Sequence, residues 1–295
     1  MKIGVVGIGK MGAAIASRLM GLGHEVAVWN RTAEKTRALA AAGAHAAKTP
    51  AELASRCECV LSILTDAKAI TTAFDDADGL LTVDVAGKLF IEMSTVRPDT
   101  ARALAARINA KGAAMIDCPV GGTVGPAKDG KLFGFVGGDA KDVARAQPLL
   151  LQLCRRIEHV GPLGAGNSMK LAINLPLLVY WQALGESLTL CRNLGLDGAR
   201  LMDIIGDTSG APAVLKGRGA AMAAAIDGTE PAQTTFDIDS VRKDLRTMIE
   251  EAASMGSRLP VAAQALECFD AASQAGLGAK DCAMLPVRWS QLKAD

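Results

Sequence analysis

The segment KIGVVGIGKMGAAIASRLMG, residues 2–21, contains the strand, turn and helix that decide the fold of this chain. Its first five residues are a short apolar run that predicts a buried strand, and residues 10–22 follow with the character of a helix. Between them, Gly7, Gly9 and Gly12 form a GxGxxG pattern. Glycines in this context let the backbone approach a pyrophosphate at a helix N-terminus, which favours a dinucleotide-binding turn.

The predicted cofactor contacts in this turn are the six residues of the motif. They are Gly7, Ile8, Gly9, Lys10, Met11 and Gly12. A GxGxxG pattern alone is a weak signal, and a glycine-rich turn without a ligand is the alternative. Its position directly after a strand and at the start of a helix makes the dinucleotide the favoured interpretation.

The end of the second predicted strand indicates which dinucleotide binds. NAD-binding sheets place an acidic residue here to bind the ribose 2′-hydroxyl. This sequence instead has Asn30, Arg31 and Thr32, which bring no carboxylate, and the last two can donate hydrogen bonds to a 2′-phosphate. NADP is therefore predicted over NAD, with NAD still possible. Alternatively, Thr32 only caps the next helix and Arg31 is a solvated charge.

The order of β-rich and helical stretches predicts the domain organisation. Strand and helix alternate from residue 2 to about 160, and only helical signals follow from about 165. The expected strands are 2–6, 25–29, 58–64, 88–94, 113–120, 132–138 and 156–160. The expected helices are 10–22, 33–42, 67–75, 98–111, 140–153, 166–193, 198–207, 211–225, 237–255, 260–274 and 279–292. We expect an α/β chain with a Rossmann-like doubly wound sheet over 1–163 and an all-helical domain over 164–295, joined by the long helix at 166–193.

Composition excludes several classes of partner. The 295 residues carry a net charge of +1 and no cluster of Lys and Arg, so neither nucleic acid nor an anionic membrane is expected as a partner. The seven cysteines are scattered, without CxxC or a nearby histidine, which predicts reduced thiols in a cytoplasmic protein and no metal site. The histidines His24, His45 and His159 adjoin predicted strands, where surface or capping roles are expected.

Five ordered motifs give the chain a specific resemblance. They are the glycine turn at 7–12, MST at 93–95, DCPVGGTVGPAKDG at 117–130, GAGNSMKLAIN at 164–174 and RKDL at 242–245. In order and spacing these resemble the β-hydroxyacid dehydrogenases, the group of 3-hydroxyisobutyrate dehydrogenase and tartronate semialdehyde reductase. The resemblance covers essentially the whole chain. It implies NAD(P)-linked interconversion of an alcohol and a carbonyl on a small acid, in a cleft between two domains.

The resemblance also implies roles for individual residues. Lys170 matches the catalytic lysine and Asn174 its partner, and Lys243 matches a lysine that closes over the nicotinamide cofactor. The remaining expected cofactor contacts are Leu64, Thr65, Ser94 and Thr95, although a proline is more usual where Thr65 stands. The glycine-rich loop is expected to hold the substrate through Gly121, Gly122 and Thr123, together with Lys170 and Asn174.

The residues around Lys170 agree with this role. Side chains four apart lie on one helix face, so Lys170 and Asn174 can converge on one small group. A lysine has a pKa of about 10.4 in peptides, and burial in an apolar site lowers it toward values useful for proton transfer. The alternative is that Lys170 extends its ammonium group out of a buried helix. For Lys243, an ordinary helical ion pair with Asp239 is the alternative.

Two departures from the family pattern make the expected substrate pocket less polar. Gly121 stands where the family commonly has serine, and Ile173 stands where it often has the first of two asparagines. A single glycine-rich turn can still offer several backbone amides to a carboxylate. We expect a substrate other than 3-hydroxyisobutyrate or tartronate semialdehyde, such as a longer or less hydroxylated semialdehyde acid.

Other interpretations remain open. An imine reductase would share the architecture, but such proteins usually lack the catalytic lysine; 6-phosphogluconate dehydrogenases share the first domain but have a longer helical region. A non-catalytic dinucleotide-binding module is the alternative outside enzymes. The long apolar helix and the helical domain further suggest a homodimer or homotetramer.

Overall fold

The computed structural model describes residues 1–229 and 234–292. Contacts divide the chain into two compact units, Met1–Leu171 and Ala172–Asp295. The boundary falls inside helix α8 (Ala165–Cys191), so the first two turns of this helix belong to the sheet-containing unit.

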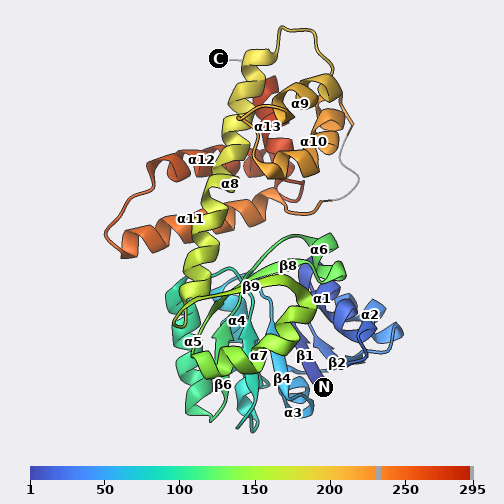
Figure 1. Cartoon of the computed structure of the whole chain (residues 1–295), viewed down its shortest axis with the longest axis vertical. Coiled ribbons are helices and arrows are strands. Elements are labelled where there is room, and N and C mark those ends of the chain that lie inside the picture. Colours follow the sequence, from blue (N-terminus) through green and yellow to red (C-terminus); the bar gives the residue numbers. More distant parts are fainter. Residues whose placement is uncertain (230–233, 293–295) are drawn as a thin grey trace. The chain divides into compact units, whose positions relative to one another are not determined.

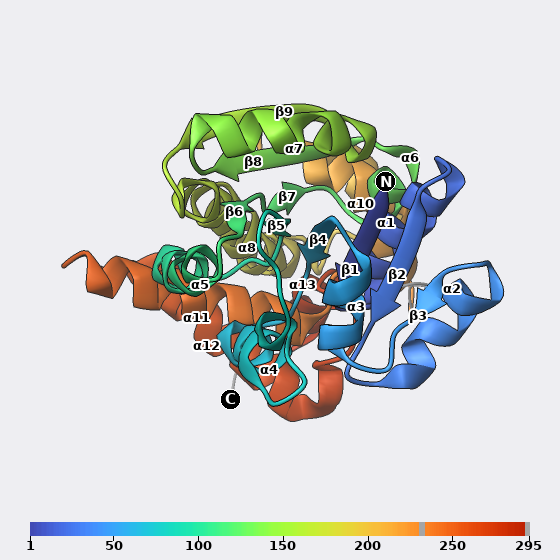
Figure 2. The same ribbon diagram turned by 90° about the horizontal axis from the view of Figure 1, so that it is seen from below.

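The first unit is built on one twisted sheet, seen in Figures 1 and 2. Its strand order is β3-β2-β1-β4-β5-β6-β8-β7, with β9 also paired to β8. Strands β3 to β6 in this order are all parallel, which confirms the predicted mainly parallel sheet. Only the pairings of β8 with β6 and β7 are antiparallel. The strands are β1 (Lys2–Val6), β2 (Glu25–Trp29), β3 (His45–Ala46), β4 (Cys59–Ser62), β5 (Leu89–Glu92), β6 (Ala114–Asp117), β7 (Val120–Gly121), β8 (Leu132–Gly137) and β9 (Cys154–Gly161).

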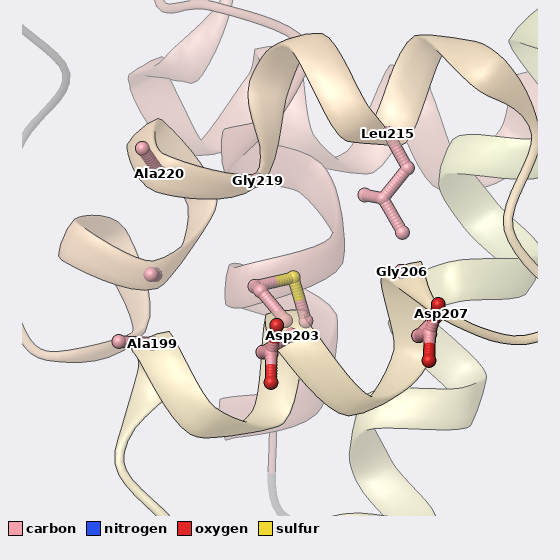
Figure 3. A pocket seen from close by; sticks show the side chains of 9 residues that line it. Ala199, Asp203, Gly206, Asp207, Leu215, Gly219 and Ala220 are labelled. Atoms are coloured by element: carbon pink, nitrogen blue, oxygen red, sulfur yellow. The ribbon is translucent and has the colours of Figure 1, made fainter.

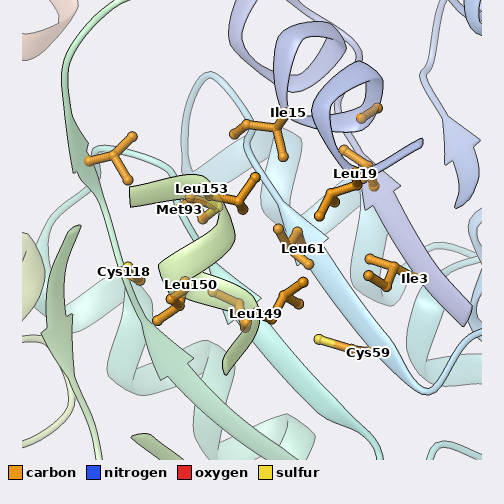
Figure 4. Packing of buried hydrophobic residues seen from close by; sticks show 14 of the residues in the cluster. Ile3, Ile15, Leu19, Cys59, Leu61, Met93, Cys118, Leu149, Leu150 and Leu153 are labelled. Atoms are coloured by element: carbon orange, nitrogen blue, oxygen red, sulfur yellow. The ribbon is translucent and has the colours of Figure 1, made fainter. Parts of the chain in front are cut away.

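Helices cover both faces of this sheet because its strands are apolar on both sides. Buried residues of α1 and α7 pack on one face, as Figure 4 shows for Ile15, Leu19, Leu149 and Leu153. Helices α3, α4 and α5 pack on the other face around a second cluster. The helical segments of this unit are α1 (Lys10–Gly21), η1 (Ala33–Thr36), α2 (Arg37–Ala41), α3 (Pro50–Arg56), α4 (Ala67–Asp75), η2 (Leu80–Thr82), α5 (Pro98–Ala110), α6 (Val124–Asp129) and α7 (Ala140–Leu153).

Several short elements of the first unit differ from the sequence prediction. Strand β3 and helix α3 were not predicted, although Thr49 caps α3 by accepting from the Glu52 N–H at 3.1 Å and Pro50 occupies its first turn. The expected glycine-rich loop contains α6, which ends at Gly130 in the left-handed conformation with φ +71°. The single strand predicted over 113–120 is divided into β6 and β7.

The second unit is all-helical over the residues that the structure describes, as predicted. Besides the rest of α8 it contains α9 (Gly198–Gly206), α10 (Ala213–Ile226), α11 (Ile238–Ser254), α12 (Pro260–Ala272), the π-helical turn η3 (Ser273–Leu277) and α13 (Met284–Gln291). The last helix begins five residues later than predicted from position 279. Asp281 holds the segment before α11 by pairing with Arg218 at 2.5 Å and accepting from the Thr235 N–H at 2.8 Å.

Candidate functional site

The glycine turn after β1 has the geometry of a phosphate cradle. Gly7 has φ +95°, which favours glycine, and a Cβ on Gly12 would lie 1.9 Å from the Gly7 carbonyl oxygen. A Cβ on Gly9 would meet nothing within 4 Å, so there is open space beside this position. The fold therefore requires glycine at positions 7 and 12, and Gly9 leaves space for a ligand beside the turn. These residues fit a dinucleotide pyrophosphate.

The end of β2 supports this turn through Asn30. Its Oδ1 accepts from the Ile8 N–H at 3.0 Å and its Nδ2 donates to the Thr32 carbonyl at 3.0 Å. Asn30 thus joins the glycine turn to the segment after β2. Arg31 is exposed, and Thr32 occupies the N-cap position of η1 without a side-chain cap hydrogen bond. The capping expected of the Thr32 hydroxyl is not observed, which leaves this hydroxyl available.

The turns after β4 and β5 lie at the same edge of the sheet. The Leu64 N–H donates to Ser94 Oγ at 2.7 Å, so these two turns are joined directly. Ser94 is buried, Thr95 is half-buried and Thr65 is exposed. In this sheet the strand order reverses between β1 and β4, and ligands of doubly wound sheets bind outside the carboxyl ends of the strands at such a point.

Lys170 lies two turns into α8, and buried side chains hold the start of that helix on the sheet. Asp117 Oδ1 accepts from the Gly164 N–H at 2.7 Å, and its Oδ2 accepts from the Asn167 N–H at 2.8 Å. Asn167 Oδ1 in turn accepts from the Val96 N–H at 3.0 Å. The helix that carries Lys170 is thereby fixed to the ends of β5 and β6, inside the first unit.

Lys170 and Asn174 are four residues apart on α8, as the sequence indicated. Only 9% of Lys170 and 8% of Asn174 is exposed, whereas 39% of Ile173 is exposed. Both members of the predicted pair are therefore buried, and Ile173 beside them is more exposed. Because lysine is rarely buried unless it is paired, the burial of both polar side chains shows that neither is an ordinary solvated surface group.

The loop expected to hold the substrate leaves space for the missing serine. Gly121 pairs with Phe133 across β7 and β8, and a Cβ on Gly121 would lie 3.6 Å from Phe135 Cε2, an ordinary contact. Gly122 has φ +122° and is constrained to glycine, and Thr123 is exposed just before α6. The backbone conformation therefore requires glycine at position 122 but not at position 121.

Lys243 belongs to the second unit and lies on α11. Its Nζ is 2.6 Å from the buried Asp244 carboxylate, and 33% of the Lys243 side chain is exposed. Asp239 accepts from Arg242 Nη1 at 2.7 Å and from Ser273 Oγ at 2.7 Å. The carboxylate expected as an alternative partner of Lys243 thus already holds an arginine and a hydroxyl.

Three fully buried polar residues at this edge were not singled out in the sequence. They are Glu92, Asp117 and Asn167, each 0% exposed. Burial raises the pKa of Glu92 to about 7, against hydrogen bonds from Ser62 and Ser94, and burial also raises the pKa of Asp117. The two acids could have been found from the sequence because each ends an otherwise apolar strand, Glu92 in LFIE and Asp117 in AMID.

A pocket of about 430 Å³ lies between α9 and α10, within the second unit (Figure 3). Small residues and two exposed carboxylates, Asp203 and Asp207, line it together with Met202 and Leu215. None of the predicted site residues lines this pocket.

Other classes of site find no support in the described residues. In positions 1–229 and 234–292, no group of three or more His, Cys, Asp and Glu side chains is arranged to hold a metal. No helix in the same ranges is both long and apolar enough to cross a bilayer. The seven cysteines are free, and burial raises the pKa of Cys57 to about 11 and that of Cys59 to about 12. Each histidine has a local partner: Gln152 for His24, Glu52 for His45 and the Gly138 carbonyl for His159.

Two family descriptions match the two parts of the chain. Residues 2–161 match the NAD-binding domain of 6-phosphogluconate dehydrogenase, and residues 164–287 match the family described as the NAD-binding region of NADP-dependent 3-hydroxyisobutyrate dehydrogenase. Together they account for most of both units.

Individual relatives agree over nearly the full length. The chain is 32% identical to glyoxylate/succinic semialdehyde reductase 1 of Arabidopsis thaliana, covering 95% of this chain and 96% of that protein. It is 33% identical to 3-hydroxyisobutyrate dehydrogenase of Pseudomonas aeruginosa over 92% of each. The solved 3-hydroxyisobutyrate dehydrogenase of Mycobacterium tuberculosis, described with L-serine, has a TM-score of 0.83, 26% identity and 99% coverage of both chains. The chain therefore belongs to the β-hydroxyacid dehydrogenase family of NAD(P)-dependent oxidoreductases.

Proposed function

We propose that this chain interconverts a small hydroxy acid and its semialdehyde or oxo acid, with NADP as the preferred cofactor and Lys170 as the general acid and base. The observation that carries the proposal is the position of Lys170. It is buried on a helix whose first turn is hydrogen-bonded to the same sheet edge as the GxGxxG turn. In this proposal the proton-transfer group and the dinucleotide-binding turn belong to the same compact unit, Met1–Leu171.

The proposed chemistry requires a hydride and a proton. When bound, a nicotinamide cofactor would supply the hydride in its reduced form and would take it back in its oxidised form. The Lys170 ammonium donates a hydrogen bond to the carbonyl oxygen, stabilises its developing charge and transfers a proton to it. In the oxidising direction the neutral amine accepts the alcohol proton. Asn174, one turn further on, orients the same oxygen or the lysine.

The proposed preference for NADP is based on residues 30–32, which follow β2. Asn30 is occupied by the Ile8 N–H and the Thr32 carbonyl, which leaves the exposed Arg31 guanidinium to pair with a 2′-phosphate. No carboxylate at positions 30–32 opposes that phosphate. The matching C-terminal family is itself described as NADP-dependent. The remaining proposed cofactor contacts are Leu64, Thr65, Ser94, Thr95 and, from α11, Lys243.

The proposed substrate differs from 3-hydroxyisobutyrate and tartronate semialdehyde. Gly121 and Ile173 remove two polar groups that the family commonly has, and Gly122 and Thr123 remain to contact the carboxylate. A longer semialdehyde such as succinic semialdehyde, or a less hydroxylated one such as glyoxylate, fits this reduced polarity. Both are named substrates of the Arabidopsis relative.

A substrate panel tests the proposal. The purified chain is assayed for NADPH and NADH oxidation with glyoxylate, succinic semialdehyde, tartronate semialdehyde and a cyclic imine, and for NADP reduction with 3-hydroxyisobutyrate. We expect the highest kcat/KM with NADPH and one of the first two acids. Fastest saturable turnover of tartronate semialdehyde or 3-hydroxyisobutyrate would contradict the substrate assignment. Reduction of the imine alone would favour an imine reductase. Binding of NADPH without turnover of any compound would favour a non-catalytic module.

Gly121→Ser is the matched variant for substrate choice. Because a Cβ at position 121 meets only ordinary contacts, the serine should fold without loss of stability. Its hydroxyl restores one of the missing polar groups, so we expect kcat/KM to shift by about tenfold toward tartronate semialdehyde, as one added hydrogen bond permits.

We also propose a cytoplasmic homodimer or homotetramer. The second unit exposes large apolar side chains near the end of α8, with Leu190 86% and Leu194 60% exposed. Such side chains are commonly covered by another subunit. Sedimentation of the purified chain at micromolar concentration tests this, and a monomer would contradict it.

A further inference from the structure

Three polar side chains form a buried row across the carboxyl ends of neighbouring parallel strands. Ser62 ends β4, Glu92 ends β5 and Asp117 ends β6. The strand register places Ser62 opposite Glu92 and Glu92 opposite Asp117. Ser62 is 1% exposed and the two acids are 0% exposed. Carboxyl groups are almost never buried completely unless their hydrogen bonds are used, so each partner of these acids is informative.

Glu92 joins the two turns that follow β4 and β5. Its Oε1 accepts from the Ser94 N–H at 2.7 Å, and its Oε2 accepts from the Ser62 hydroxyl. Ser94 Oγ then accepts from the Leu64 N–H at 2.7 Å. The carboxyl group therefore sets the positions of Leu64 and Ser94, the two residues proposed to contact the dinucleotide beside the glycine turn.

Asp117 acts on a different element, the N-terminus of α8. Each of its oxygens accepts a backbone N–H, from Gly164 at 2.7 Å and from Asn167 at 2.8 Å. The backbone packs closely here, because a Cβ on Gly137 would lie 2.3 Å from Asp117 Oδ1 and a Cβ on Gly166 would lie 2.8 Å from Oδ2. A carboxylate at this end of a helix is also favoured by the helix dipole. Lys170 follows Asn167 by one turn.

We propose that these adjacent carboxyl groups are positioning residues with separate tasks: Glu92 aligns the cofactor-binding turns, and Asp117 aligns Lys170. Neither is proposed to touch substrate or cofactor. The assignment rests on the proposed function for Lys170 and for the two turns. The two tasks follow from the hydrogen bonds of each carboxyl group. Glu92 accepts from Ser62 and Ser94, whereas Asp117 accepts from Gly164 and Asn167 at the start of α8.

Replacing each carboxyl group by the corresponding amide should have different effects at the two positions. In Glu92→Gln the amide oxygen can still accept from the Ser94 N–H, and the amide nitrogen can donate to Ser62 Oγ, because a hydroxyl can accept as well as donate. In Asp117→Asn the amide nitrogen must face one of two backbone N–H donors, which cannot accept. Glutamine should therefore replace Glu92, whereas asparagine should not replace Asp117.

The experiment measures cofactor affinity, turnover and helix protection in three variants. We compare Glu92→Met, Glu92→Gln and Asp117→Asn by NADPH fluorescence titration, by kcat at saturating NADPH and by hydrogen exchange of the amides of residues 164–171. Glu92→Met should weaken NADPH binding by about tenfold, the effect of unsatisfied buried donors, and Glu92→Gln should restore the affinity. Asp117→Asn should lower kcat by about 10 to 100 fold and speed exchange in 164–171, with NADPH affinity within about threefold of the original.

Controls keep this proposal separate from general destabilisation and from the proposed function. Glu58→Gln changes an exposed acid before β4 at the opposite edge of the sheet and should leave all three measurements unaltered. If Asp117→Asn does not fold, Asn167→Ala, which removes the acceptor for the Val96 N–H, provides the second test by exchange and kcat. NADPH titration and hydrogen exchange need no substrate. If no substrate is found, the proposed function fails, but these two measurements still test the positioning roles of Glu92 and Asp117. Equal loss of NADPH affinity in Glu92→Gln and Glu92→Met, or unchanged exchange and kcat in Asp117→Asn, would overturn the proposal.

Discussion

Arg31 is the residue on which the cofactor preference depends. Its guanidinium is exposed after β2, beside a turn that Asn30 holds in place. Charge-assisted hydrogen bonds to a phosphate are worth about 1.5–3 kcal/mol, so Arg31→Ala should raise the Kd for NADPH by about 10 to 100 fold. Affinity for NADH should change little because it lacks the phosphate. Titration of both cofactors checks this.

Arg37→Ala is the control for that measurement. Arg37 is an exposed arginine of the same segment and lies 3.7 Å from Glu34. Its removal should leave both affinities as they were. Equal weakening of NADPH and NADH in Arg31→Ala, or the same loss in Arg37→Ala, would count against a 2′-phosphate contact at Arg31.

Glu92 gives the stability of the chain a pH dependence of known sign. Burial raises its pKa in the folded chain to about 7, from 4.5. Between these values the folded state holds a proton that unfolding releases, so the free energy of unfolding falls as pH rises, by up to about 1.4 kcal/mol per pH unit. The stabilisation is complete below about pH 4.5 and is lost as pH passes about 7.

Thermal unfolding from about pH 5 to pH 7.5 measures this effect. Glu92→Gln has no proton to release, so its Tm should fall less over this range than that of the original chain. Glu58→Gln, an exposed acid, should keep the original slope. Parallel Tm curves for Glu92→Gln and the original chain would show that Glu92 is ionised throughout.

Single residues could be predicted where their chemistry is local. The glycines of the turn and the spacing of Lys170 and Asn174 follow from positions in the sequence, because adjacent or helical residues meet by geometry alone. The contacts of Asp117 with Gly164 and Asn167 join segments 47 and 50 positions apart. Only the folded sheet brings these together, so their partners could not be predicted.

The turn between β1 and α1 allows a prediction at the scale of an element. Gly9→Ala adds a Cβ that meets nothing within 4 Å, so the fold should be unaffected while the methyl group obstructs the pyrophosphate. Gly12→Ala places its Cβ 1.9 Å from the Gly7 carbonyl oxygen, so the turn itself must deform. We expect Gly9→Ala to keep its Tm and lose about tenfold or more in NADPH affinity, and Gly12→Ala to lose about 1–3 kcal/mol of stability.

Thermal unfolding and NADPH titration of both variants distinguish the two effects. Loss of stability in Gly9→Ala would show that position 9 is required by packing rather than by a ligand. Normal stability of Gly12→Ala would show that α1 does not approach Gly7 as closely as described.

The longer helices of the first unit were predictable, whereas its shortest elements were not. The boundaries of α4 and α7 match the prediction, because sustained apolar spacing defines a helix of this length. Helix α6 has six residues within a glycine-rich stretch, and β3 has two. Elements this short are stabilised by their neighbours rather than by their own pattern, and so leave little periodicity in the sequence.

At the scale of the molecule, the change from alternating to purely helical signals near residue 165 predicted both architectures. The compact units divide at Leu171, inside α8. The helix is one continuous element, and its first turns pack on the sheet through Asp117, so contacts assign them to the first unit. The boundary predicted at 163/164 marks the residue where the helical sequence pattern begins. The boundary at Leu171 marks the residue where contacts within one compact unit give way to contacts within the other.

Lys170 is proposed to transfer the proton, while the sheet edge binds the cofactor independently of it. Lys170→Met keeps the length of the side chain and removes only the ammonium group. General acid and base groups contribute about 10²–10⁴ in rate, so kcat with the best substrate of the panel should fall by about a thousandfold. The Kd for NADPH should stay within about threefold of the original value, as should both constants in the exposed control Lys111→Met. Turnover of Lys170→Met within a few fold of the original chain would contradict the account, and Lys170 would then be a structural lysine on a buried helix.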